Sequence, residues 1–191
     1  MKTGQVIANM AAAAFAVIAN TSVAGAAATP TVPERLQVPL NEELALQVRA
    51  TGSQIYMCTA MPETSRFEWT LKAPEADLFD SDGNKIGSHY AGPTWELTDG
   101  SKVAGRIVAR ADAPDHDALP WLLLDATSNA GTGRLAGVSS IQRIDTVGGA
   151  PPAQACDLGH LNAEVRVPYE ATYAFYAFDG EPLPWMILGG N

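Results

Sequence analysis

The sequence predicts an all-β fold: an antiparallel β-sandwich or barrel with long loops and one disulfide. Short segments with alternating apolar and polar residues, the period of a half-buried strand, recur along the chain. The dipeptides Asp82-Gly83 and Asp99-Gly100 lie between such segments, and glycine supplies the positive φ that tight hairpin turns require. After residue 50, no segment of convincing length has the pattern of the helical crossover that a parallel sheet needs.

The first predicted strand has Leu44, Leu46 and Val48 on one face, with more polar residues between them. A helix is the competing interpretation at this point, because Glu42 and Glu43 are good helix formers. Further strands are predicted by the same alternation at residues 54–59, 67–71, 85–90, 94–97 and 102–110.

The second half of the chain continues the pattern. Residues 121–124 form a short apolar run led by Pro120, which is typical of a strand buried on both faces. A glycine-rich loop at 129–133 and a strand near 138–144 follow. The last predicted strand, 165–178, places one row of aromatic and small residues in the core: Tyr169, Ala171, Tyr173, Phe175 and Ala177.

The N-terminus has the three parts of a secretory signal peptide. Lys2 is the single basic residue, an apolar middle follows, and the small residues 24–28 offer A-x-A cleavage sites. A retained membrane anchor is the alternative, but Asn9 and Asn20 interrupt the apolar stretch. The predicted organisation is a signal peptide at 1–28, an extended N-terminal arm at 29–43 and a single β domain at 44–191.

Charge and cysteine content restrict the partners and the compartment. The net charge of −9, with no run of basic residues, disfavours binding to nucleic acid and to anionic lipid surfaces, and no stable membrane insertion is expected after signal cleavage. The expected location is therefore periplasmic or secreted. In that oxidising setting Cys58 and Cys156 are predicted to form a disulfide rather than reactive thiols.

Several motifs, in order and spacing, resemble a known family. They include 52–58 (GSQIYMC), 73–76 (APEA), 87–96 (GSHYAGPTWE), 120–124 (PWLLL), 141–143 (IQR), 146–151 (TVGGAP), 167–169 (VPY) and 173–176 (YAFY). Together they resemble the domain-of-unknown-function 3455 (DUF3455) family of exported bacterial and fungal proteins. The resemblance implies no mechanism, because the family has no established activity, although some fungal members carry a malate dehydrogenase label.

Such a label would require a dinucleotide cofactor, and the sequence predicts none. Residues 131–136 (GTGRLA) match the G-x-G-x-x-A pattern, but that motif must open a helix whose N-terminus holds the pyrophosphate. The residues that follow are poor helix formers, so a loop between strands is the better interpretation. Residues 80–84 (DSDGN) resemble a calcium loop, but the glycine and the terminal glutamate are misplaced, and a hairpin turn is predicted. No metal site is predicted.

The candidate ligand-binding residues come from the segment around the Gly-Pro turn before Trp95 and from two later strands. An imidazole beside aromatic side chains can form the floor of a site for a small molecule or a glycan. His116 and His160 lie in polar segments and are interpreted as loop residues. The predicted site consists of His89, Trp95, Glu96, Trp121 and Arg143.

Two other functions stay open at this stage. The first is an extracytoplasmic enzyme, either a hydrolase that uses two carboxylates or a metal-dependent oxidoreductase that uses His89. It needs a second histidine or a carboxylate within reach of that imidazole. The second is a structural protein of the envelope or secretome without a pocket. No catalytic residue is assigned from the sequence.

Overall fold

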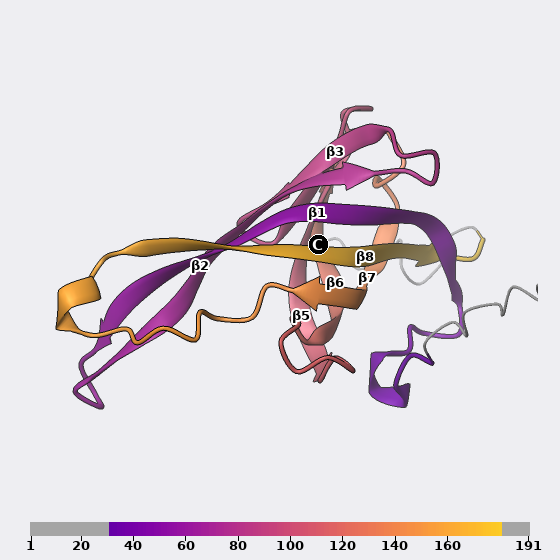
Figure 1. Ribbon diagram of the computed structural model, residues 1–191. Coiled ribbons are helices and arrows are strands. Elements are labelled where there is room, and N and C mark those ends of the chain that lie inside the picture. The colour runs from indigo at the N-terminus through magenta and orange to yellow at the C-terminus, as the bar shows by residue number, and fades with distance from the viewer. Residues whose placement is uncertain (1–30, 181–191) are drawn as a thin grey trace, which may run out of the picture.

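A computed structural model describes residues 31–180 of the chain (Figure 1). The predicted signal peptide at 1–28 lies outside the described residues, as do the first residues of the predicted arm and the last eleven residues of the predicted domain. Within residues 31–180, no helix is long and apolar enough to cross a membrane.

The protein is a closed antiparallel β-barrel in which each strand pairs with the next along the chain and β8 pairs back with β1. The prediction of an all-β antiparallel fold is confirmed, and ring closure decides between the two predicted architectures in favour of the barrel. The strands are β1 (Glu42–Met61), β2 (Arg66–Phe79), β3 (Lys85–Tyr90), β4 (Thr94–Leu97), β5 (Lys102–Ala111), β6 (Trp121–Ala130), β7 (Val138–Gly148) and β8 (Glu164–Phe178).

The core consists of two clusters on opposite sides of the barrel wall. The larger cluster fills the interior and includes Trp95, Leu124 and Phe175. The smaller cluster packs outside the wall, where Trp121 meets Leu36 of a short 3-10 helix, η1 (Glu34–Leu36). Because successive side chains of a strand point to opposite faces, β6 is buried on both, as predicted for residues 121–124.

The N-terminal arm and the strand lengths differ from the prediction in detail. β1 begins at Glu42 and runs unbroken through Gly52, where two separate strands were predicted. Leu36 in the arm is completely buried, and its carbonyl oxygen accepts a hydrogen bond from Nε2 of Gln142 at 2.6 Å. The arm therefore covers part of the barrel wall rather than only linking two segments.

The glycine-rich segment after β6 is a loop that is closed by Asp99. The Asp99 carboxylate accepts hydrogen bonds from the backbone N–H groups of Ser101 and Arg134 and from the Ser101 hydroxyl. These bonds hold the pKa of Asp99 at about 2. No helix follows in the described part of the chain before β7, so the segment lacks the element that a dinucleotide site requires.

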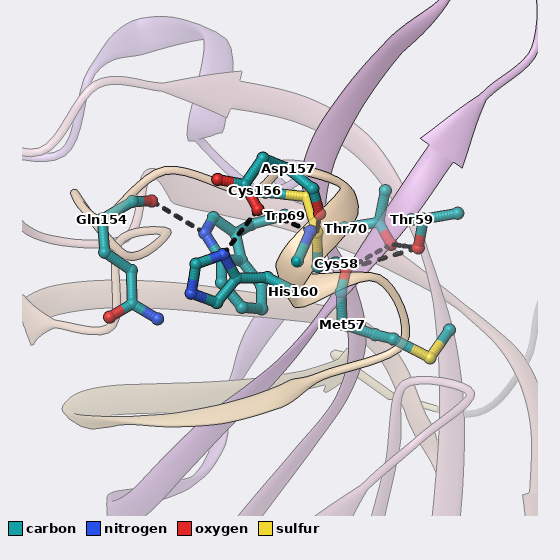
Figure 2. Close-up of a disulfide and its surroundings, with 10 residues drawn as sticks. Met57, Cys58, Thr59, Trp69, Thr70, Gln154, Cys156, Asp157 and His160 are labelled. Atoms are coloured by element: carbon teal, nitrogen blue, oxygen red, sulfur yellow. Dashed lines mark hydrogen bonds and ion pairs between the residues drawn. A yellow bond between two sulfur atoms is a disulfide. The ribbon is translucent and has the colours of Figure 1, made fainter.

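At one end, β1, β2 and β8 run past the other strands and form a projection with the loop before β8 (Figure 1). The predicted disulfide between Cys58 and Cys156 is present in this projection (Figure 2). Beside it, the indole N–H of Trp69 donates to the carbonyl oxygen of Gln154 at 2.9 Å. The disulfide thus fixes the long loop against β1, next to the entrance that is described below.

We expect the disulfide to stabilise the protein by constraining the unfolded chain. The double variant Cys58→Ala/Cys156→Ala should have a free energy of unfolding up to about 4 kcal/mol lower, because the cysteines are 98 residues apart. Denaturant unfolding with and without reductant measures this difference. Reductant should weaken the parent protein and leave the double variant unchanged; equal sensitivity of the two proteins would contradict the expectation.

Gly52 should tolerate no side chain, because a Cβ atom at this position would collide with the backbone of Glu75 and Ala76 on β2. Gly52→Ala is expected to lower the free energy of unfolding by about 2 kcal/mol or more. Gly137→Ala is the matched control, since a Cβ atom there meets nothing within 4 Å. Thermal or denaturant unfolding of both variants tests the difference, and equal stabilities would disprove the steric explanation.

Candidate functional site

A cavity of about 180 Å³ opens through the barrel wall beside the turn between β3 and β4. Residues 71–74 of β2 and 91–93 of the turn form its rim, and side chains of the barrel interior form its floor. The polar and aromatic residues of the floor and inner walls are Gln54, His89, Trp95, Arg143 and Tyr173.

The opening exists because β3 and β4 are much shorter than their neighbours. β3 pairs with β2 only between Ala76 and Phe79, so the earlier part of β2 is hydrogen-bonded to β1 alone. Pro74 lies in this part, where a strand with a neighbour on one side tolerates proline. Between the free side of β2 and β5, the turn at 91–93 is held by a hydrogen bond from Gly105 N–H to the Pro93 carbonyl oxygen.

His89 lies on the inner wall, with its ring stacked on Trp95. The ring centroids are 4.6 Å apart at an interplanar angle of 10°, and Tyr173 packs against the imidazole at 5.0 Å. The pKa of His89 is lowered to about 4, chiefly by burial and to a smaller extent by the positive charge of Arg143, against the opposing effect of the hydrogen bond to the Thr94 carbonyl. At neutral pH the ring is uncharged, so Nδ1–H donates to the Thr94 carbonyl oxygen at 2.8 Å.

Several buried polar atoms around the cavity have no hydrogen-bond partner among residues 31–180. Gln54 is 1% exposed, and neither its amide nitrogen nor its amide oxygen is paired. The Trp95 indole nitrogen is also unpaired, whereas the Tyr173 hydroxyl lies close to the Tyr169 hydroxyl and the Arg143 guanidinium. Buried polar groups are normally hydrogen-bonded, so the unpaired groups of Gln54 and Trp95 single out this cavity as the candidate site.

Arg143 contributes the positive charge of the inner wall. It is 9% exposed, and its Nε and Nη2 groups donate to the carbonyl oxygen of Pro120 at 3.2 and 2.9 Å. Its charge opposes the rise that burial causes in the pKa of Tyr173. The guanidinium therefore adds a positive charge to the lining of an otherwise largely apolar cavity.

The structure brings His89, Trp95 and Arg143 of the predicted site together, but not Glu96 or Trp121. Glu96 follows Trp95 on β4 and lies on the outer face, where it accepts a hydrogen bond from Tyr90 and pairs with Lys102.

Trp121 precedes the cavity residue Leu122 on β6 and packs in the outer cluster. In both cases neighbouring residues of a strand point to opposite sides, so adjacency in the sequence does not give adjacency in the site.

The sequence reasoning did not assign Gln54 or Tyr173 to the site. Tyr173 was predicted to lie in the core, which is correct, and its side chain also lines the cavity. Gln54 carried a usable signal, because it is a polar residue next to the buried Ile55 and Tyr56 in a strand. A buried polar side chain in such a run is a candidate for binding.

No carboxylate and no second histidine lines the cavity itself. A neighbouring hollow that also includes His89 is lined by Glu75 and Asp77. Among residues 31–180, no group of three or more histidine, cysteine, aspartate or glutamate side chains is placed to hold a metal. His116 is exposed in the loop before β6, as predicted, and His160 lies on η2 (Leu158–His160), hydrogen-bonded to Asp157 at 2.8 Å.

Comparison with known families decides the relationship that the motifs suggested. A family model described as "Protein of unknown function (DUF3455)" matches residues 39–177, which include every strand of the barrel in whole or in large part. The chain belongs to the DUF3455 family. This family match includes all the cavity residues named above. No curated protein and no solved structure gives a significant match, so the DUF3455 assignment brings no activity with it.

The neutral, buried state of His89 predicts a pH dependence of stability. Because its pKa falls from 6.5 in the unfolded chain to about 4 in the folded protein, the unfolded state binds more protons between these values. Stability is complete above about pH 6.5 and decreases towards pH 4, by up to about 3 kcal/mol.

A His89→Gln variant should lose this part of the pH dependence, since glutamine does not titrate. Urea unfolding measured at several pH values between 4 and 7 checks the difference between parent and variant. His116→Gln is the matched control, because it removes an exposed histidine. An identical change in both variants would show that the dependence does not come from the buried ring.

Proposed function

We propose that this protein is an exported small-molecule binding protein whose ligand enters the barrel through the cavity beside the β3–β4 turn. The observation that carries the proposal is Gln54, a fully buried amide that faces the cavity without a partner for either polar atom. An unpaired buried polar group costs about 1–3 kcal/mol. A ligand that pairs with this amide recovers that energy, which gives binding a driving force.

The dimensions of the cavity favour a small ligand with an aromatic or compact apolar body. A cavity of about 150 Å³ is large enough to hold benzene, and this one has about 180 Å³. Its walls include Trp95, Tyr173 and Leu124, which offer flat and apolar contacts. The volume suits a single ring, so a small molecule fits the site better than an extended glycan does.

The barrel architecture supports the same function. An eight-stranded barrel has an interior just wide enough to be filled by side chains or to hold one small ligand. In this barrel apolar side chains, Trp95 among them, fill most of the interior, and the cavity opens beside the turn at 91–93. The proposed ligand site is therefore a gap in the packing of the barrel interior. Its walls are strands, which form a rigid scaffold, so binding requires little rearrangement of the protein.

Export is the second part of the proposal. The N-terminal pattern of a signal peptide and the disulfide between Cys58 and Cys156 both support an oxidising compartment outside the cytoplasm. A periplasmic or secreted protein meets small molecules directly, which agrees with a cavity that opens to the surface.

Filling the cavity should abolish binding without unfolding the protein. Ala73 lies on the rim, so an Ala73→Trp variant is expected to occupy the cavity with its indole. Calorimetry with benzamide and benzoate as probes should give a Kd below about 1 mM for the parent and no measurable binding for this variant.

Ala60→Trp is the matched control, because Ala60 is exposed on the projecting part of β1 and does not line the cavity. This control should bind the probes as the parent does. Equal binding by Ala73→Trp and the parent would place the site elsewhere. Absence of binding of both probes to the parent at millimolar concentrations would overturn the proposal.

A further inference from the structure

We infer that the ligand is a small organic anion whose carboxylate pairs with Arg143, while its apolar body lies between Trp95 and Tyr173. This inference rests on the proposed function and specifies the chemical class of the ligand. The argument depends on the partners of Arg143, on the charges around the entrance and on the nature of the cavity walls.

Arg143 is a buried cation without an anionic partner. It forms no ion pair with any carboxylate among residues 31–180. Its hydrogen-bond acceptors in that part of the chain are neutral: the carbonyl oxygen of Pro120 and, close by, the hydroxyl of Tyr173, so none of them balances the charge of the guanidinium. A guanidinium presents its N–H groups in a planar fork that matches the two oxygens of a carboxylate.

The burial of this charge needs a compensating group. Buried charges in proteins are paired or coordinated, because an isolated ion loses its hydration when it leaves water. Neutral acceptors compensate only part of this loss. Since Arg143 lines the cavity at 9% exposure, an anion that enters the cavity supplies the missing charge.

The side of the cavity on which Arg143 lies is bordered by basic and not by acidic side chains. A second hollow of about 440 Å³ adjoins the cavity and shares Leu71, Ile107, Leu122 and Arg143 with it. Its ionisable lining groups other than Tyr56 are Arg110, His116 and Arg143. Because the whole chain carries a net charge of −9, this basic lining does not follow from composition.

The other charged side chains near the cavity do not provide an anionic partner for Arg143. Asp112 and Asp115, on the loop before β6, line a different hollow. Lys72 is on the rim of the cavity but pairs with Glu164, so it is already neutralised. Two cationic side chains line the cavity, Lys72 and Arg143, and of these Arg143 is the one without an anionic partner among the described residues. Positive charge at an entrance also attracts anions by electrostatic steering.

The remaining walls fix the other end of the ligand. His89 is neutral at pH 7, and Trp95, Tyr173, Leu122 and Leu124 are apolar over most of their surface. A molecule with a carboxylate at Arg143 then places its body against these side chains. The unpaired amide of Gln54 offers an NH2 donor group and a carbonyl acceptor to a further polar substituent of the ligand.

Benzoate and benzamide test the inference, because they have nearly the same size and shape and differ in charge. Calorimetry at low salt should give a Kd for benzoate that is about 10- to 100-fold lower than that for benzamide with the parent protein. The Arg143→Gln variant should lose this preference and bind both probes with similar Kd values, whereas Arg143→Lys should retain part of the preference.

Arg106→Gln is the matched control, since Arg106 is an exposed arginine that pairs with Asp125 away from the cavity lining. It should leave the benzoate preference intact. If Arg143→Gln fails to fold, the comparison of the two probes on the parent and on Arg143→Lys still decides the outcome.

The outcomes separate this inference from the proposed function. Equal Kd values for benzoate and benzamide, with both lost in Ala73→Trp, would disprove the anion preference and leave the binding function intact. A benzoate preference that survives in Arg143→Gln would assign it to another residue and overturn the inference. Failure of both probes to bind the parent would refute the proposed function itself.

Discussion

The hydrogen-bonded ladder between β1 and β8 closes the sheet, and the arrangement of the interior depends on it. These strands pair from Glu42 and Phe178 to Met57 and Glu164, which joins the two ends of the described chain along most of the barrel height. Closure turns one face of every strand into an interior of fixed width. Eight strands leave room there for side chains and at most one small ligand.

The unequal strand lengths then decide where this interior meets solvent. β1, β2 and β8 are long, whereas the β3–β4 hairpin is short, so the wall is complete on one side and interrupted next to β2. The disulfide and the loop at 149–163 brace the projecting strands beside the opening.

The cavity residues break the rule that buried polar groups are paired. Gln54 leaves both polar atoms of its amide unpaired, and Arg143 lacks an anion, although apolar residues at these positions would pack without such a loss. Such local conflicts in an otherwise consistent fold are expected at functional sites. Under the function proposed above, a matching ligand regains the free energy that these conflicts cost the barrel.

Much of the fold was predictable from local signals. The alternation of apolar residues, the Asp-Gly turns and the cysteine pair depend on neighbouring residues or on compartment, so the strands and the disulfide followed from the sequence. Strand ends were less predictable: β2 continues through Pro74, because in this region it has a neighbour on one side only. That exception is invisible without the neighbouring strands.

The sequence by itself determined that the chain forms antiparallel strands and that His89 lies beside the Gly-Pro turn that precedes Trp95. Only the tertiary structure decided which residues share the cavity, because ring closure brings together side chains as distant as Gln54 and Tyr173 and strand alternation turns Glu96 and Trp121 away from it. The tertiary structure also decided the charge of the site. The chain is acidic overall, but the folded barrel places Arg143 in a cavity that no carboxylate lines.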